Sequence, residues 1–199
     1  MIKNIIFDFG NVIAAFDPDA IIRYYEEDSG DHDLLKECAF RYWSCLDSGM
    51  MDYEVYKEKT RSEADPSILP ALERFFDSWY TRLPLLDGVA EWIRELKKQG
   101  FGLYILSNAS VFFAEHSDYF GVNDVFDGIV FSGCIKMVKP DREIYEYLLH
   151  TYGLKPEECL FFDDMERNIE AAERIGIHGM VFAGDVEAAK TRLKEVNGR

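Results

Sequence analysis

The sequence predicts an α/β fold, a three-layer arrangement of helices on a parallel sheet, with a small helical segment inserted after the first strand. Three observations predict it. Short apolar runs alternate with helical patterns from residue 87 onward, the opening run at 2–7 is rich in β-branched residues, and the segment 16–86 shows helical patterns without a convincing strand. Alternation at this spacing is typical of strands joined by right-handed helical crossovers.

The strands of this Rossmann-like core are short apolar runs, as expected for strands buried on both faces. The first, at 2–7, ends at Asp8-Phe9-Gly10-Asn11. Gly100 and Gly176 end two of the helices, and Pro140 begins another. Further strands are expected at 101–106, 125–131, 159–162 and 180–182, and helices at 89–99, 110–119, 140–152, 166–175 and 185–196.

The inserted segment is expected to be a helical bundle. Apolar and aromatic residues recur at helical spacing in 20–27, 33–43, 53–61 and 69–82. Asp-Pro pairs at 17–18 and 65–66 and the Asp-Ser-Gly run at 47–49 separate these helices. The predicted organisation is therefore an α/β core domain, residues 1–15 and 87–199, and a helical cap domain, residues 16–86.

Composition excludes several classes of function. The 199 residues carry 37 acidic and 22 basic side chains, a formal net charge of −15, which argues against nucleic acid and against an anionic membrane surface as partners. No apolar run approaches the roughly 18 residues of a spanning helix, and no export signal opens the sequence. The four cysteines form no CxxC pair, so we expect reduced thiols, mostly in the core, and a cytoplasmic protein. The four histidines do not cluster and receive no role.

Polar residues follow three of the predicted strands. Asp8 follows the first strand, Ser107-Asn108 the second, and Asp163-Asp164 the strand at 159–162, while Lys139 precedes a helix. Ligands of parallel sheets bind beyond the carboxyl ends of the strands, so these groups should meet at one edge. Grouped carboxylates repel unless protons or a cation neutralise them, and a hard divalent ion such as Mg²⁺ suits oxygen ligands.

These residues resemble the four motifs of the haloacid dehalogenase (HAD) superfamily. The matching segments are Phe-Asp-Phe-Gly-Asn-Val at 7–12, Leu-Ser-Asn at 106–108, Lys-Pro at 139–140 and Phe-Phe-Asp-Asp at 161–164, with Asn168. The resemblance covers essentially the whole chain, with 16–86 in the position of the family's helical cap. The opening and closing motifs are similar to a branch of bacterial HAD phosphatases that includes glucose-1-phosphate phosphatases.

The resemblance implies a role for each motif residue. Asp8 would be the nucleophile that forms an aspartyl-phosphate. Asp8 and Asp164 would hold Mg²⁺, with Asp163 as a further ligand or partner and Gly10 contributing its backbone carbonyl. Ser107, and the backbone or side-chain amide of Asn108, would hydrogen-bond the phosphoryl oxygens. Lys139 would offset negative charge on Asp8 and on the phosphoryl group.

Position 10 departs from the family pattern. Most HAD phosphatases carry a second Asp there, which serves as general acid and base, and this chain has Gly10. Such proton transfer is typically worth about 10²–10⁴-fold in rate. Asp17 and Asp19, just downstream, are possible substitutes, and a good leaving group such as an anomeric hydroxyl would suffer least from the loss.

The cap is expected to set specificity, and Trp43 with Asp47, one helical turn apart, are the candidate sugar contacts. The predicted function is that of an Mg²⁺-dependent phosphatase acting on a small phosphorylated metabolite, a sugar phosphate such as glucose 1-phosphate. The alternatives are a metal-independent dehalogenase, which has no evident use for paired acids at 163–164, and a non-catalytic HAD-fold binding protein. Because 16–86 carries 16 acids and 8 bases, phosphate capture should depend on the metal and Lys139 and not on long-range attraction.

Overall fold

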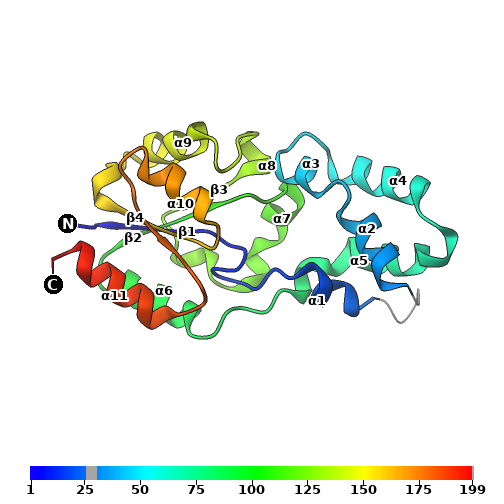
Figure 1. Cartoon of the computed structure of the whole chain (residues 1–199), viewed down its shortest axis with the longest axis horizontal. Helices are drawn as coiled ribbons and strands as arrows, with labels where there is room; N and C mark the ends of the chain where they lie inside the picture. Colours follow the sequence, from blue (N-terminus) through cyan, green and yellow to red (C-terminus); the bar gives the residue numbers. More distant parts are fainter. Residues whose placement is uncertain (26–30, 199) are drawn as a thin grey trace.

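The computed structural model describes residues 1–25 and 31–198, and its centre is one parallel sheet (Figure 1). The strands are β1 (Asn4–Phe7), β2 (Gly102–Ser107), β3 (Gly128–Phe131), β4 (Cys159–Asp163) and β5 (His178–Val181). Their spatial order is β3-β2-β1-β4-β5, and every neighbouring pair is parallel. The predicted α/β class is confirmed.

Register places the chemically important strand ends level with one another. Phe7, the last residue of β1, lies opposite Ile105 of β2 and Phe162 of β4. The Asp8 backbone N–H then donates to the Phe162 carbonyl at 2.8 Å. The residues that follow β1 and β4 therefore leave the sheet side by side. The connection after β1 leads to β2 on one side and the connection after β4 leads to β5 on the other, and such a point is the usual place for a ligand.

Side chains of the sheet alternate between two apolar layers. Ile5 and Phe7 belong to the cluster that includes Trp92 of α6 (Val89–Lys98) and Leu193 of α11 (Val186–Val196). Ile6 belongs to the second cluster, formed with α9 (Arg142–Tyr152) and α10 (Glu166–Glu173). Figure 1 shows these helix pairs on opposite sides of the sheet, which gives the three layers that the sequence predicts.

Between β1 and α6 the described residues form helices joined by loops, with isolated β-bridges but no strand, and Figure 1 shows these helices beyond one end of the sheet. The apolar residues of this segment belong to the same cluster that packs against α6 and α11, since Phe75 and Trp79 share that cluster with Phe7. Its helices are α1 (Pro18–Arg23), α2 (His32–Phe40), α3 (Trp43–Asp47), α4 (Tyr53–Glu63), η2 (Pro66–Ile68), α5 (Leu69–Ser78) and η3 (Trp79–Arg82). We call 16–86 the cap; its division from the core at 15/16 and 86/87 stays a prediction.

Several predicted bounds differ from the structure. The helix expected at 33–43 is divided into α2 and α3. The helix expected at 20–27 is α1, which ends at Arg23 and is followed by a turn at 24–25; residues 26 and 27 lie outside the described residues. The strand expected at 125–131 begins only at Gly128, because 123–125 form a 3₁₀ turn. Elements not predicted are α8 (Ser132–Ile135) and the 3₁₀ turns η2, η4 (Ser117–Phe120), η5 (Asn123–Val125) and η6 (Pro156–Glu158). The helix α7 (Val111–His116) is shorter than expected, and the helix expected at 69–82 is divided into α5 and η3.

The cysteines follow the prediction in part. Cys38 and Cys159 are buried and Cys45 is partly buried, but Cys134 in the unpredicted helix α8 is exposed. All four are free thiols. Within the described part of the chain, no helix combines the length and the apolar character that crossing a bilayer requires.

Candidate active site

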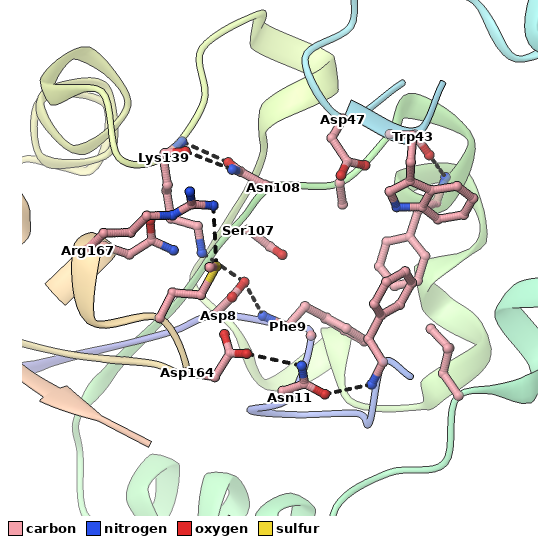
Figure 2. Close-up of a pocket in the computed structure, with 18 of the residues that line it drawn as sticks. Asp8, Phe9, Asn11, Trp43, Asp47, Ser107, Asn108, Lys139, Asp164 and Arg167 are labelled. Atoms are coloured by element: carbon pink, nitrogen blue, oxygen red, sulfur yellow. Dashed lines mark hydrogen bonds and ion pairs between the residues drawn. The ribbon is translucent and has the colours of Figure 1, made fainter. Parts of the chain in front are cut away.

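A pocket of about 260 Å³ lies beyond the carboxyl ends of the central strands, between the sheet and the cap (Figure 2). One side is polar and comes from the residues after β1, β2 and β4. The opposite side is largely aromatic and comes from the cap and α7. The lining includes all but one of the predicted site residues: Asp8, Gly10, Trp43, Asp47, Ser107, Asn108, Lys139 and Asp164.

Asp8 lies at the base of this pocket and is only 8% exposed. Its Oδ1 accepts a hydrogen bond from the Phe9 backbone N–H at 2.7 Å and lies 2.9 Å from Lys139 Nζ. Burial raises the pKa of Asp8 to about 6, although Lys139 and a hydrogen bond from Ser107 act in the opposite direction. The Asp8 carboxylate is thus held in one orientation, close to the Lys139 ammonium, directly after the last residue of the buried strand β1.

Lys139 is a buried cation held between two carboxylates. Its Nζ lies 2.9 Å from Asp8 Oδ1 and 2.7 Å from Asp163 Oδ2, and the residue is 3% exposed. Burial disfavours the charged ammonium, but the two carboxylates outweigh that effect and raise the pKa of Lys139 above its ordinary value. The ammonium therefore stays charged next to Asp8, as a group that offsets phosphoryl charge must.

Asn108 positions the backbone of Lys139. Its Nδ2 donates to the Lys139 carbonyl at 2.9 Å, and its Oδ1 accepts from the Lys139 N–H at 2.8 Å. Both ends of the amide are therefore occupied. Of the two phosphoryl contacts predicted for Asn108, the backbone N–H is the one that this geometry favours.

Asp163 lies below the pocket, fully buried, and holds Lys139 in place. Its Oδ1 accepts from the Met165 N–H at 2.8 Å, and Asn168 Nδ2 donates to Oδ1 and Oδ2 at 2.9 and 3.0 Å. With both oxygens already bonded, Asp163 acts as a partner of Lys139. This geometry favours the partner role over the alternative role of metal ligand.

The donor set fits a hard divalent cation. Asp8, Asp163 and Asp164 each offer a carboxylate oxygen, and these oxygens lie within 4.8 Å of one another. Oxygen-only donors suit Mg²⁺. Because Asp163 is engaged with Lys139, the two carboxylates best placed to bind the ion are Asp8 and Asp164, with Gly10 beside them in the lining.

Asn11 fixes the loop that follows Asp8. Its Nδ2 donates to Asp164 Oδ2 at 3.0 Å, and its Oδ1 accepts from the Phe16 N–H at 2.8 Å. Its φ of 55° is left-handed, a conformation that Asn adopts more readily than most residues. Asn11 thereby links the loop after β1 to the loop after β4 and to the start of the cap.

The cap side of the pocket carries one carboxyl among aromatic rings. Trp43, Trp79 and Phe16 line it, with ring centroids of Trp43 and Trp79 4.7 Å apart. Asp47, half-buried at the end of α3, faces the same space (Figure 2). Burial, helped by the charge of Asp8, raises the pKa of Asp47 to about 8, while Lys139 lowers it. The predicted pair Trp43 and Asp47 thus lies where a substrate would contact the cap.

The predicted substitute acids lie elsewhere. Asp17 is exposed, is absent from the pocket lining and caps α1 by accepting from the Asp19 N–H. Asp19 accepts from Lys36 at 2.7 Å and pairs with His32 at 3.0 Å. Both carboxylates stabilise the start of the cap, so the structure does not support either as the missing acid.

One pocket residue had no sequence signal. Arg167, in the first turn of α10, lines the opening, and its guanidinium contacts the Met165 sulfur at 3.5 Å. Within the described residues it pairs with no carboxylate. Lys139 has two of its three N–H donors committed to Asp8 and Asp163, so Arg167 is a second cation of the lining, without a carboxylate partner among the described residues, that is available to an anionic ligand.

Comparison with known families identifies this arrangement. The sequence model of the haloacid dehalogenase-like hydrolases matches residues 2–176. The chain belongs to this family. The match spans β1 to α10 and so includes each strand end that builds the HAD site, which confirms the superfamily that the motifs indicate.

Curated relatives of the HAD chain include several phosphatases. It is 36% identical over 89 residues to a sesquiterpene phosphatase of Aspergillus oryzae, 44% of this chain and 45% of that protein. It is 34% identical over 126 residues to enolase-phosphatase E1 of Aquifex aeolicus, 58% of this chain and 56% of that protein. The chain thus spans about half the length of these relatives. A longer match, 25% identical over 187 residues, is D-ribitol-5-phosphate phosphatase of Bacteroides thetaiotaomicron, 88% of this chain and 89% of that protein.

Solved structures support the HAD fold. A HAD family enzyme of Bacteroides thetaiotaomicron, crystallised with magnesium and inorganic phosphate, superposes with a TM-score of 0.74 at 20% identity, covering 96% of this chain and 99% of that one. An L-2-haloacid dehalogenase of Xanthobacter autotrophicus gives 0.67 at 20% identity, covering 100% and 84%. The fold is therefore shared with a HAD enzyme crystallised with magnesium and phosphate and with a dehalogenase, so the fold alone does not decide between phosphatase and dehalogenase and the pocket residues must.

Proposed function

We propose that the chain is an Mg²⁺-dependent phosphatase that hydrolyses a small phosphorylated metabolite through an aspartyl-phosphate on Asp8. The observation that carries the proposal is the convergence of Asp8, Ser107, Lys139 and Asp164 in one pocket. An enzyme that attacks carbon without a metal has no evident use for a carboxylate such as Asp164 beside the nucleophile, whereas Asp163 serves either enzyme as the partner of Lys139. The phosphatase names among the relatives support the same choice.

Each residue has a definable task in phosphoryl transfer. Asp8, oriented by the Phe9 N–H, attacks phosphorus. Lys139, kept charged by Asp8 and Asp163, offsets negative charge on the phosphoryl oxygens, and Ser107 offers them a hydroxyl. Bound at Asp8 and Asp164, Mg²⁺ would neutralise phosphoryl charge and screen the carboxylates from their dianionic substrate.

The pocket favours a compact, polar substrate. Its volume of about 260 Å³ admits a small metabolite, and its cap side offers Trp43 and Trp79 as flat apolar surfaces next to the Asp47 carboxyl. This combination suits a sugar or sugar-alcohol phosphate, such as glucose 1-phosphate, whose ring or chain has both apolar and hydroxyl faces. Arg167, which pairs with no carboxylate of the described residues, adds a second positive charge to the lining beside Lys139, in a protein that is acidic overall.

The test is a phosphate-release screen over sugar phosphates and nucleotides, with and without EDTA, beside halide release from 2-haloacids. We expect phosphate release that EDTA abolishes and Mg²⁺ restores. Hydrolysis that EDTA leaves undiminished would contradict the metal-dependent mechanism, and halide release would support the dehalogenase alternative. Complete inactivity with Mg²⁺ present would favour a binding protein.

A further inference from the structure

The proposed reaction needs a proton donor that Gly10 does not supply. When the phosphoryl group moves to Asp8, the bond to the leaving oxygen breaks, and an alkoxide leaves poorly unless it is protonated. Within the described residues, three carboxyls line the pocket: Asp8, Asp47 and Asp164. Asp8 is the proposed nucleophile, and Asp164 is bonded to Asn11 and proposed to bind the metal. Asp47 is the carboxyl that remains.

The core holds Asp47 in place through its backbone. The Ser132 hydroxyl, at the start of α8, donates to the Asp47 carbonyl, and the same hydroxyl accepts from the Ala109 N–H at 2.9 Å. Just after α3, Gly49 packs directly on Gly133, leaving no room there for a side chain. The end of α3 is thus clamped to the loop after β2 and to the segment after β3, so the cap carboxyl has a fixed place over the core site.

The side chain of Asp47 lies across the pocket from Asp8. Figure 2 shows it on the cap side, with the Asp8 carboxylate at the base on the other side. The attacking and leaving oxygens of phosphoryl transfer are roughly in line. A leaving group displaced by Asp8 therefore departs toward the cap, where Asp47 lies.

The environment of Asp47 keeps a proton available. Within the described chain its carboxyl has no hydrogen-bond or ion-pair partner. The charged groups that influence it are Asp8 and Lys139 from the core, and burial together with Asp8 raises the pKa of Asp47 to about 8. An acid with a pKa near the working pH is suited both to donate a proton and to take one back.

We propose that Asp47 is the general acid and base of this enzyme, supplied by the cap in place of the missing acid at position 10; the proposal rests on the phosphatase function above. In the first step the Asp8–phosphorus bond forms, the bond from phosphorus to the leaving oxygen breaks, and that oxygen takes the Asp47 proton. In the second step water attacks phosphorus, the Asp8–phosphorus bond breaks, and the Asp47 carboxylate takes the proton of the water.

The experiment compares Asp47→Asn with wild type on substrates of increasing leaving-group basicity: p-nitrophenyl phosphate, glucose 1-phosphate and glucose 6-phosphate. The value of kcat/KM reports the steps up to phosphoryl transfer. Since asparagine keeps the shape but donates no acidic proton, we expect kcat/KM for glucose 6-phosphate to fall by about 10²–10⁴-fold. The value for p-nitrophenyl phosphate should stay close to wild type, with a burst of p-nitrophenolate because hydrolysis of the intermediate has lost its base.

Asp17→Asn is the matched control, since it makes the same change at an exposed cap acid and asparagine also caps helices well. It should leave all three values unchanged. Equal losses on all substrates in Asp47→Asn would make Asp47 a binding residue only, and unchanged values would remove it from the mechanism; either result overturns the inference while the phosphatase function stands. If wild type releases phosphate from none of them, the proposed function and this inference both fail.

Discussion

Replacing Lys139 with methionine tests the electrostatic centre of the site. The substitution keeps an unbranched side chain, one atom shorter, and removes the charge that lies 2.9 Å from Asp8 and 2.7 Å from Asp163. Both carboxylates would then be buried without a cation, since Asp8 is 8% and Asp163 0% exposed. Removing one partner of a buried ion pair typically costs about 3–5 kcal/mol. At about 2–4 °C per kcal/mol for a protein of this size, the melting temperature should fall by about 6–20 °C.

The loss of stability in Lys139→Met should depend on pH in a defined direction. The pKa of Asp8 is already raised to about 6, and without Lys139 it would rise further. The native state then holds a proton that the unfolded state has lost above its ordinary pKa near 4, so stability falls as pH rises from about 4 through neutrality. The deficit should therefore be largest at pH 8 and smaller at pH 5.

Thermal unfolding followed by calorimetry at pH 5 and pH 8, in EDTA, measures both effects. The control is Lys98→Met, which removes the same charge from the exposed end of α6 and should change stability by less than about 0.5 kcal/mol. If the melting temperature of Lys139→Met at pH 8 equals that of Lys98→Met, the pairing of Lys139 with Asp8 and Asp163 does not stabilise the fold.

Three further changes have defined outcomes. Asp164→Ala should weaken Mg²⁺ binding in calorimetric titration by at least about tenfold, since even outer partners of metal ligands are worth about 10–100-fold; unchanged affinity would place the metal elsewhere. Asp47→Asn should melt above wild type at pH 8 and level with it near pH 4, because the folded pKa of about 8 costs stability as pH rises through that window; a constant difference across this range would refute the raised pKa. Gly10→Asp should fold normally, since an added Cβ meets only Phe16 Cβ at 3.6 Å, and in the Asp47→Asn background it should restore hydrolysis of glucose 6-phosphate. Failure of that rescue, in a double variant with wild-type melting, would mean that the loss was not one of proton transfer.

The sequence alone was sufficient to predict that the five strands exist and that polar groups lie at their ends. Asp8, Ser107 and Asp164 directly follow or end strands, and the carboxyl ends of parallel strands meet at one edge whatever the details of packing. Their convergence in one pocket was therefore predictable from local patterns and topology alone. The same reasoning placed Lys139, but only the coordinates reveal that it pairs with both Asp8 and Asp163.

The proposed general acid, Asp47, was harder to predict, because its position depends on a long-range contact. Asp17 is close to Asp8 in sequence, but its carboxylate is consumed in capping α1. Asp47 reaches the pocket because its backbone is bonded to Ser132, 85 residues away, in a helix that the sequence did not predict. Arg167 likewise belongs to no motif, and it lines the pocket from the first turn of α10, the helix that follows β4.

The central claim is that hydrolysis passes through a phosphorylated Asp8 and depends on Mg²⁺. Mass spectrometry of enzyme quenched in acid during turnover tests it directly, and Asp47→Asn is the best sample because its intermediate should be hydrolysed slowly. The account predicts a mass gain of one phosphoryl group on the peptide that contains Asp8, present with Mg²⁺ and absent with EDTA or in Asp8→Asn. Steady turnover with that peptide unmodified, or a phosphoryl group carried by another residue, would contradict the account.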